Sequence, residues 1–325
     1  MTGASSGLGR ATAIAFARQG CAVVLAARRD DALEATAALC RAAGGDALVV
    51  PTDVTVEAEV AHLVDTTLAT WGQIDVWVNN AGVTLYALLE DAPLALHRQV
   101  LEVNLLGAII CARAVVPVFR RAHRGVLIEV SSVLGGVGQA FVPSYVISKF
   151  GVHGLAEALR VELADEPDIH VCTVFPYAID TPHFEAAGDQ IGRAAHALPP
   201  VQDPARVADA IVGLARRPRR TRYVPRWMAL GLVLHALAPR TTERLLLDAL
   251  RRWHLTDERT HIGAGNLFHP GDEPAATRGH RGPKLGMAKF TAWLLGRLVR
   301  NELEAVGRFA RRVLGGPARL AGGQE

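Results

Sequence analysis

The sequence of 325 residues has little cysteine and no long uninterrupted hydrophobic run, and each shortage excludes a class of protein. Its four cysteines, Cys21, Cys40, Cys111 and Cys172, lie far apart, and no Cys-x-x-Cys pair predicts a zinc or redox site. The longest apolar stretch, Trp227 to Ala238, is shorter than the run of about 18 residues that crosses a bilayer. No basic-then-apolar signal segment opens the sequence. We therefore expect a globular protein of the reducing cytoplasm, with no metal site.

The charge is also too small to predict a nucleic-acid partner, since the formal net charge is only +3. Residues 281–325 hold nine Lys/Arg against three Glu, so the positive balance belongs to this tail. Within it, residues 286–315 combine apolar side chains at helical spacing with arginines, which predicts a basic amphipathic helix. Such a helix can pack on its own chain or a partner subunit, close over a pocket, or make weak contact with an anionic membrane surface.

Alternation of short β-branched runs with Ala-rich amphipathic stretches predicts repeated βαβ units, and hence a doubly wound parallel sheet, over residues 1–226. The expected strands are Ala22–Ala26, Ala47–Val50, Asp75–Asn79, Val126–Ser131, Ile169–Val174 and Thr221–Val224. The expected helices are Leu8–Gln19, Asp31–Ala43, Val56–Trp71, Leu94–Arg121, Tyr145–Asp165 and Pro204–Arg216. Residues 227–325 read as a C-terminal extension: a helical segment to Trp253, a Gly- and Pro-rich connector over 262–286, and the basic helix.

A glycine-rich turn opens the chain and leads directly into the first helix. It reads Thr2-Gly3-Ala4-Ser5-Ser6-Gly7-Leu8-Gly9. Glycines allow a backbone to approach a pyrophosphate closely, and the following helix N-terminus offers free N–H groups. This turn therefore predicts a phosphate-binding loop.

Lysine is the scarcest charged residue, with only Lys149, Lys284 and Lys289 against 32 arginines. Lys149 nevertheless lies four residues after Tyr145, a coincidence expected only roughly 0.04 times by random spacing. On a helix these two side chains share one face. A phenol is a weak base at neutral pH, and a nearby cation favours its ionised form, so the pair predicts a proton-transfer site at Tyr145.

Together these motifs resemble the short-chain dehydrogenase/reductase family over roughly residues 1–225. The resemblance rests on the glycine turn, Asn79-Asn80-Ala81-Gly82 after a strand, Asn104 in a helix, Ser132 after a strand, and Tyr145 with Lys149. It implies a Rossmann sheet, a nicotinamide cofactor, and hydride exchange between an alcohol and a carbonyl compound. It further implies a homo-oligomer with a small-molecule substrate.

The resemblance also implies a role for each matching residue. Ser132 would orient the substrate oxygen, with Ser131 as the alternative. Asn104 would hold a water that connects Lys149 to solvent, unless it only interrupts its helix with local hydrogen bonds. The expected cofactor contacts are Gly3, Ser5, Ser6, Gly7, Leu8, Gly9, Arg28, Asp53, Val54, Asn80, Ala81, Gly82, Tyr145, Lys149, Pro176, Ile179 and Thr181.

Arg28 favours NADP(H) over NAD(H), although NAD(H) is possible. The second strand is followed by Arg28-Arg29-Asp30, with no acidic residue at the strand's end to hold a free 2′-hydroxyl. Arginine can instead pair with a 2′-phosphate. Alternatively, both arginines face solvent and Asp30 caps the next helix. The glycine turn lacks the second basic residue that some family members carry.

Two departures from the family pattern stand out. The chain begins at the glycine turn, so the preceding central strand is missing, and its absence would leave neighbouring strand edges unpaired. We expect the residues of that strand to be encoded upstream of Met1, the given chain being a fragment or having a misassigned start.

Tyr177 stands after Pro176 where the family usually has glycine, and either narrows the pocket or is simply tolerated.

The sequence says little about the identity of the substrate. The expected lid, Pro182 to Pro200, contains His183, Phe184 and His196 but no charged handle, which favours an apolar alcohol or ketone. A rival interpretation is a non-catalytic nucleotide-binding or interaction protein with this fold, or an inactive truncated fragment. The intact set of Ser132, Tyr145 and Lys149 argues against the rival.

Overall fold

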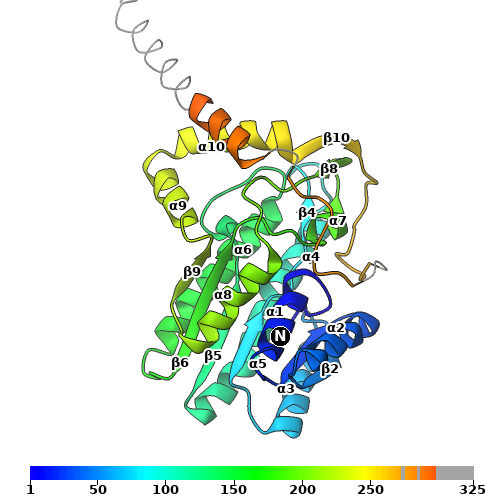
Figure 1. Ribbon diagram of the computed structural model, residues 1–325, viewed down its shortest axis with the longest axis vertical. Helices are drawn as coiled ribbons and strands as arrows, with labels where there is room; N and C mark the ends of the chain where they lie inside the picture. Colours follow the sequence, from blue (N-terminus) through cyan, green and yellow to red (C-terminus); the bar gives the residue numbers. More distant parts are fainter. Residues whose placement is uncertain (272–274, 284–285, 298–325) are drawn as a thin grey trace, which may run out of the picture.

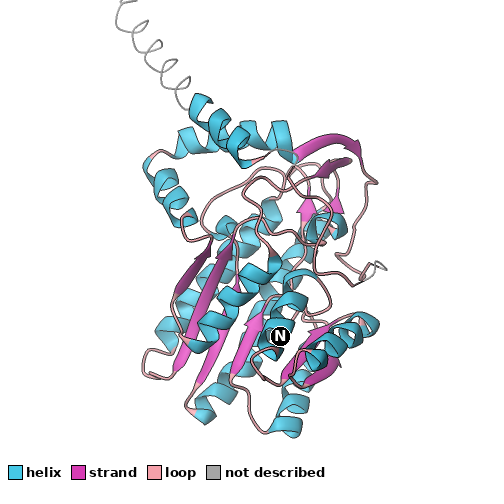
Figure 2. Cartoon of the chain, in the orientation of Figure 1, coloured by secondary structure: helices cyan, strands magenta, loops and turns pink. Residues whose placement is uncertain are grey.

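A computed structural model describes residues 1–271, 275–283 and 286–297, and shows helices on both faces of a parallel sheet (Figures 1 and 2). Four strands follow the order β3-β5-β6-β9, and a separate pair is formed by β1 and β2, all in parallel pairing. The strands are β1 (Val23–Ala27), β2 (Ala47–Pro51), β3 (Val76–Asn79), β5 (Gly125–Val130), β6 (Ile169–Pro176) and β9 (Thr221–Val224). The predicted fold class and all six predicted strands are confirmed.

Met1 and Thr2 occupy the position between β1 and β3. The Met1 ammonium donates to the Val24 carbonyl (3.1 Å), and the Ala26 amide donates to the Met1 carbonyl (3.0 Å). On the other side, the Thr2 amide donates to the Val78 carbonyl (3.1 Å). The Ala4 amide adds a bond to the Ala26 carbonyl (3.2 Å), so Met1 to Ala4 bridge the two parts of the sheet, and among the described residues no longer strand lies between them.

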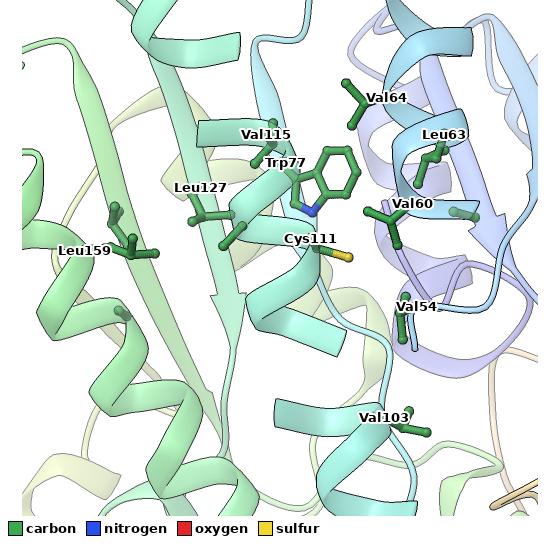
Figure 3. Packing of buried hydrophobic residues seen from close by; sticks show 14 of the residues in the cluster. Val54, Val60, Leu63, Val64, Trp77, Val103, Cys111, Val115, Leu127 and Leu159 are labelled. Atoms are coloured by element: carbon green, nitrogen blue, oxygen red, sulfur yellow. The ribbon is translucent and has the colours of Figure 1, made fainter. Parts of the chain in front are cut away.

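The helices cover the sheet in two layers. They are α1 (Gly7–Ala17), α2 (Asp30–Ala42), α3 (Glu57–Trp71), α4 (Leu94–Leu101), α5 (Gly107–Ala122), α6 (Pro143–Glu162) and α8 (Pro204–Arg216). One core cluster joins α1, α2 and α8 to the sheet, and the other joins α3, α5 and α6 to it. Figure 3 shows the Trp77 ring in this second cluster, between Val115 and Cys111 of α5 and Val60 and Val64 of α3. The six predicted helices of this region are confirmed.

The helical run Leu94–Ala122 is long and apolar enough to cross a membrane, by length and composition alone. However, 44% of its most apolar window is buried inside the protein. Val100, Cys111, Val115 and Phe119 of this run belong to the main core. The run is therefore a core element of this fold, apolar because it covers the sheet.

The C-terminal extension lies at the end of the sheet toward which the strands point (Figure 2). It begins with α9 (Met228–Leu237), α10 (Pro239–Ala249), a π-helical turn (Leu250–His254) and β10 (Leu255–Arg259). The sequence did not predict β10 or its antiparallel partner β8 (Arg193–Ala195), nor the short parallel pair β4 (Leu85–Tyr86) and β7 (Gly188–Asp189). Residues 287–297 are helical, while most of the predicted basic helix lies outside the described residues.

Candidate active site

A cavity of about 360 Å³ runs along the carboxyl ends of the strands. It is lined by every residue that the sequence predicted for the site except Asn104: Gly3, Ser5, Ser6, Gly7, Leu8, Gly9, Arg28, Asp53, Val54, Asn80, Ala81, Gly82, Ser132, Tyr145, Lys149, Pro176, Ile179 and Thr181. Ligands of open α/β sheets bind in this place, outside the carboxyl ends of the strands. The fold therefore brings together residues that are up to about 180 positions apart in sequence.

The glycine turn is closely packed at its glycines, which leave no room for a side chain. A Cβ on Gly9 would lie 1.9 Å from the Gly3 carbonyl oxygen, so any side chain there would force the turn open. The Thr2 hydroxyl accepts hydrogen bonds from the amides of Asn80 (3.0 Å) and Ala81 (3.1 Å). These bonds join the turn to the segment after β3. The turn lines the cavity beside the N-terminus of α1, a place that suits the pyrophosphate of a dinucleotide, although the Gly7 amide here donates to the Ala276 carbonyl (2.8 Å).

Tyr145 and Lys149 meet in this cavity from one face of α6. The Lys149 Nζ lies 5.4 Å from the centroid of the Tyr145 ring and donates to the Val130 carbonyl (2.9 Å). Burial lowers the pKa of Lys149 to about 8, while Glu129 opposes this change. The predicted juxtaposition of phenol and ammonium is present.

The expectation that the ammonium lowers the pKa of the phenol is not met in this structure. Burial raises the pKa of Tyr145 to about 12, and a hydrogen bond with Ser132 only partly offsets it. Desolvation disfavours the charged form of any buried group, and it is the largest cause of the raised pKa of Tyr145 here. The phenol of Tyr145 therefore holds its proton at neutral pH and can donate it.

Ser131 and Ser132 both line the cavity, but the Ser131 hydroxyl is already bonded to backbone. The Ser131 Oγ donates to the Lys149 carbonyl (3.0 Å), which ties strand β5 to α6. The Ser132 Oγ accepts from the Leu134 amide (3.2 Å) and interacts with Tyr145. Of the two alternatives, the geometry favours Ser132 as the hydroxyl beside the phenol.

Asn104 lies behind the cavity, in a π-helical turn (Glu102–Leu106) between α4 and α5. Its Oδ1 accepts from the Val83 amide (2.7 Å), and its Nδ2 donates to the Val83 carbonyl (2.9 Å) and the Ser148 Oγ (3.0 Å). These bonds link segments distant in sequence, so the alternative of purely local hydrogen bonds is wrong. Asn104 fixes the loop after β3 against α6.

Glu129, which the sequence analysis missed, lies beside this group at the centre of the sheet. Its side chain is 0% exposed, and its Oε1 accepts a hydrogen bond from the Asn79 Nδ2 (2.8 Å). Its Oε2 has no hydrogen-bond partner among the described residues. Burial raises the pKa of Glu129 to about 8, which Asn79 and Lys149 oppose. The sequence signal that could have identified Glu129 is its position as an acidic residue inside the apolar strand β5.

The remainder of the cavity is a largely apolar chamber in front of Tyr145. It is lined by Tyr86, Val142, Tyr177, His183, Phe184, Leu198, Leu250 and His254. Tyr177 thus does face the cavity, whereas His196 of the expected lid does not line it. The His183 Nε2 bonds to the Thr84 Oγ1 (2.6 Å), and burial together with Lys149 lowers the pKa of His183 to about 4. The chamber therefore presents uncharged groups at neutral pH.

Comparisons with known proteins identify the family of this chain. The short chain dehydrogenase family model matches residues 1–192. This chain belongs to the short-chain dehydrogenase family. The Bacillus subtilis oxidoreductase YxnA is 35% identical over 249 residues, which cover 76% of this chain and 70% of that protein. Cis-4-hydroxycyclohexanecarboxylate dehydrogenase of Sinomonas cyclohexanicum is 39% identical over 226 residues, which cover 66% and 87%.

Solved structures of short-chain dehydrogenases share the fold. An alcohol dehydrogenase from Thermococcus sibiricus, complexed with 5-hydroxy-NADP, superposes with a TM-score of 0.60 at 27% identity. The match covers 69% of this chain and 92% of that one. Levodione reductase gives the same TM-score at 25% identity, covering 69% and 93%. The family uses NAD(P)(H) to interconvert alcohols and carbonyl compounds, and this chain is accordingly an oxidoreductase.

Proposed function

We propose that this short-chain dehydrogenase exchanges hydride between a nicotinamide cofactor and a small alcohol or ketone, with Tyr145 as proton donor and acceptor. The observation that supports this most directly is the placement of Tyr145 and Lys149 in the cavity that also contains the glycine turn. A proton donor and a phosphate cradle in one cavity are the two requirements of carbonyl reduction with a dinucleotide. In this proposal residues 1–226 form the catalytic domain and residues 227–325 its extension.

The residues of the cavity have separate roles in the proposed reaction. A nicotinamide cofactor, when bound, supplies or accepts the hydride. In reduction Tyr145 gives its phenolic proton to the substrate oxygen, which Ser132 orients by hydrogen bonding. Lys149 then stabilises the phenolate that remains, and Asn104 positions α6 and the loop after β3. In oxidation the same phenolate takes the proton back.

We propose NADP(H) as the preferred cofactor, with NAD(H) also accepted. Arg28 lines the cavity, which supports a 2′-phosphate contact and argues against the alternative of a solvent-facing loop charge. The 5-hydroxy-NADP in the Thermococcus sibiricus relative supports the same assignment.

The chamber in front of Tyr145 favours a substrate with an apolar carbon frame. Most of the residues that line it are apolar or aromatic, and its two histidines, His183 and His254, have pKa values lowered to about 4 by burial. The Sinomonas cyclohexanicum relative is named for cis-4-hydroxycyclohexanecarboxylate, a cyclic secondary alcohol that also carries a carboxylate, and this supports a cyclic alcohol or its ketone as substrate.

Turnover of a substrate panel tests the proposal. We would follow nicotinamide absorbance with cyclic and acyclic ketones and alcohols, each with NADPH or NADH and the matching oxidised form. We expect at least one cyclic ketone to be reduced. Binding of cofactor without turnover of any compound would instead favour the rival, a non-catalytic nucleotide-binding protein.

We also propose a cytoplasmic homo-oligomer. All four cysteines are free thiols, which suits a reducing compartment. Ile147 and Phe150 on α6 are 52% and 45% exposed, and a partner subunit would cover them. Light scattering during gel filtration tests the assembly: an Ile147→Asp variant should dissociate, and a wild-type monomer would contradict it.

A further inference from the structure

A segment of the C-terminal extension, Gly263–Gly271, crosses the mouth of the cavity next to Arg28, and we call it the strap. Its path is fixed at several points. Gly263 and Asp189 exchange two backbone hydrogen bonds of 2.9 Å, and the Asn266 amide donates to the Ala186 carbonyl (2.9 Å). The Leu267 side chain is 0% exposed within the main core. The strap is therefore part of the folded domain.

Gly265 makes this path possible. Its φ is +53°, and a Cβ there would lie 2.4 Å from the Ala187 carbonyl oxygen. Both facts require glycine at this position, because a side chain would be strained and would collide with backbone. A substitution here should thus displace the strap without touching the glycine turn.

The strap carbonyls converge on Arg28. The Arg28 guanidinium donates to the carbonyls of Asn266 (2.8 Å), Phe268 (2.9 Å) and Leu267 (3.5 Å). Arg29 donates to the Gly271 carbonyl (3.0 Å) in the same way. Asn266, Pro270 and Gly271 line the same cavity as Arg28. The group that would bind a 2′-phosphate is hence already bonded to the protein's own backbone.

We propose that the strap is a determinant of cofactor specificity, in which its carbonyls compete with the 2′-phosphate of NADP(H) for Arg28. This inference rests on the proposed function, since it concerns the cofactor site. A guanidinium has a fixed fork of donors, so N–H groups engaged by carbonyls are lost to phosphate. Carbonyl oxygens beside the site also repel phosphate oxygens. A 2′-hydroxyl, in contrast, can donate to such a carbonyl, so the strap reduces the advantage of NADP(H) over NAD(H).

Binding of cofactor fragments tests the competition without catalysis. We would measure 2′,5′-ADP and 5′-AMP by calorimetry and take the ratio of their affinities as the contribution of the 2′-phosphate. Displacing the strap with Gly265→Ala should raise this ratio about tenfold, the effect of one charge-assisted hydrogen bond. The matched control is Gly263→Ala, whose Cβ would meet only the His261 ring at 3.5 Å, and it should leave the ratio unchanged.

Arg28→Ala in the Gly265→Ala background should abolish the gain, because the strap acts through Arg28. A folded Gly265→Ala variant with an unchanged or lower ratio would overturn the proposal. If neither fragment binds to the wild-type protein, the proposed function fails as well. If both bind and only the ratio is unaffected, the proposed function stands and the strap is merely structural.

Hydrogen exchange on the wild-type chain provides a second test that does not depend on a variant folding. Amide protection over residues 263–271 should fall when 2′,5′-ADP is added, because phosphate displaces the carbonyls from Arg28. It should not fall with 5′-AMP. Equal protection with both nucleotides would contradict the competition.

Discussion

Replacing Glu129 by glutamine should flatten the pH dependence of stability. The carboxyl is completely buried, and its pKa is raised from 4.5 to about 8, mainly by burial. The folded state therefore keeps a proton that the unfolded state has lost between these pH values. The free energy of unfolding must then fall as pH rises from about 4.5 to about 8. At 1.36 kcal/mol per pKa unit, the full loss is about 5 kcal/mol.

Glutamine has the same shape and can still accept the hydrogen bond from Asn79, but it does not titrate in this range. We would compare urea denaturation of wild type and Glu129→Gln between about pH 5 and about pH 8. The wild type should lose several kcal/mol more than the variant. The control is Glu57→Gln, an exposed glutamate paired with Arg113. Parallel pH profiles for wild type and Glu129→Gln would refute the reasoning.

Four further predictions concern the cavity and its supports. Ser132→Ala should lower kcat/KM by about 10²-fold, whereas Ser131→Ala should not, as measured by steady-state kinetics. Gly9→Ala should abolish the thermal shift given by NADP⁺, because a Cβ there would collide with the Gly3 carbonyl at 1.9 Å. Leu267→Ala should lower the free energy of unfolding by about 2–5 kcal/mol in urea titrations, since it empties a fully buried site. Reductive kcat/KM should fall as pH rises through about 8, where the Lys149 ammonium loses its proton; a flat profile to pH 10 would contradict that role.

The sequence predicted the sheet and most of the site because both depend on local patterns. β-branched runs gave strands such as β5 and β6, and the helical spacing of Tyr145 and Lys149 placed them on one face of α6. Parallel topology then brought the strand ends together in one cavity.

The features that the sequence did not predict depend on contacts between segments that are distant in sequence. β4 and β7 are two residues each, too short for any periodic pattern, and they form only because the lid returns to the loop after β3. The pKa of Tyr145 depends on its burial, which composition does not reveal. The strap contacts Arg28 across about 240 residues, and its glycine-rich sequence predicted only an irregular connector.

The most direct test of the central claim, proton transfer by Tyr145, is the turnover of Tyr145→Phe beside Tyr223→Phe. Tyr223 stacks on Phe175 outside the cavity and serves as the matched tyrosine. We predict that Tyr145→Phe still binds NADPH but reduces ketones about 10²- to 10⁴-fold more slowly, while Tyr223→Phe keeps the wild-type rate. Wild-type turnover by Tyr145→Phe would contradict the account.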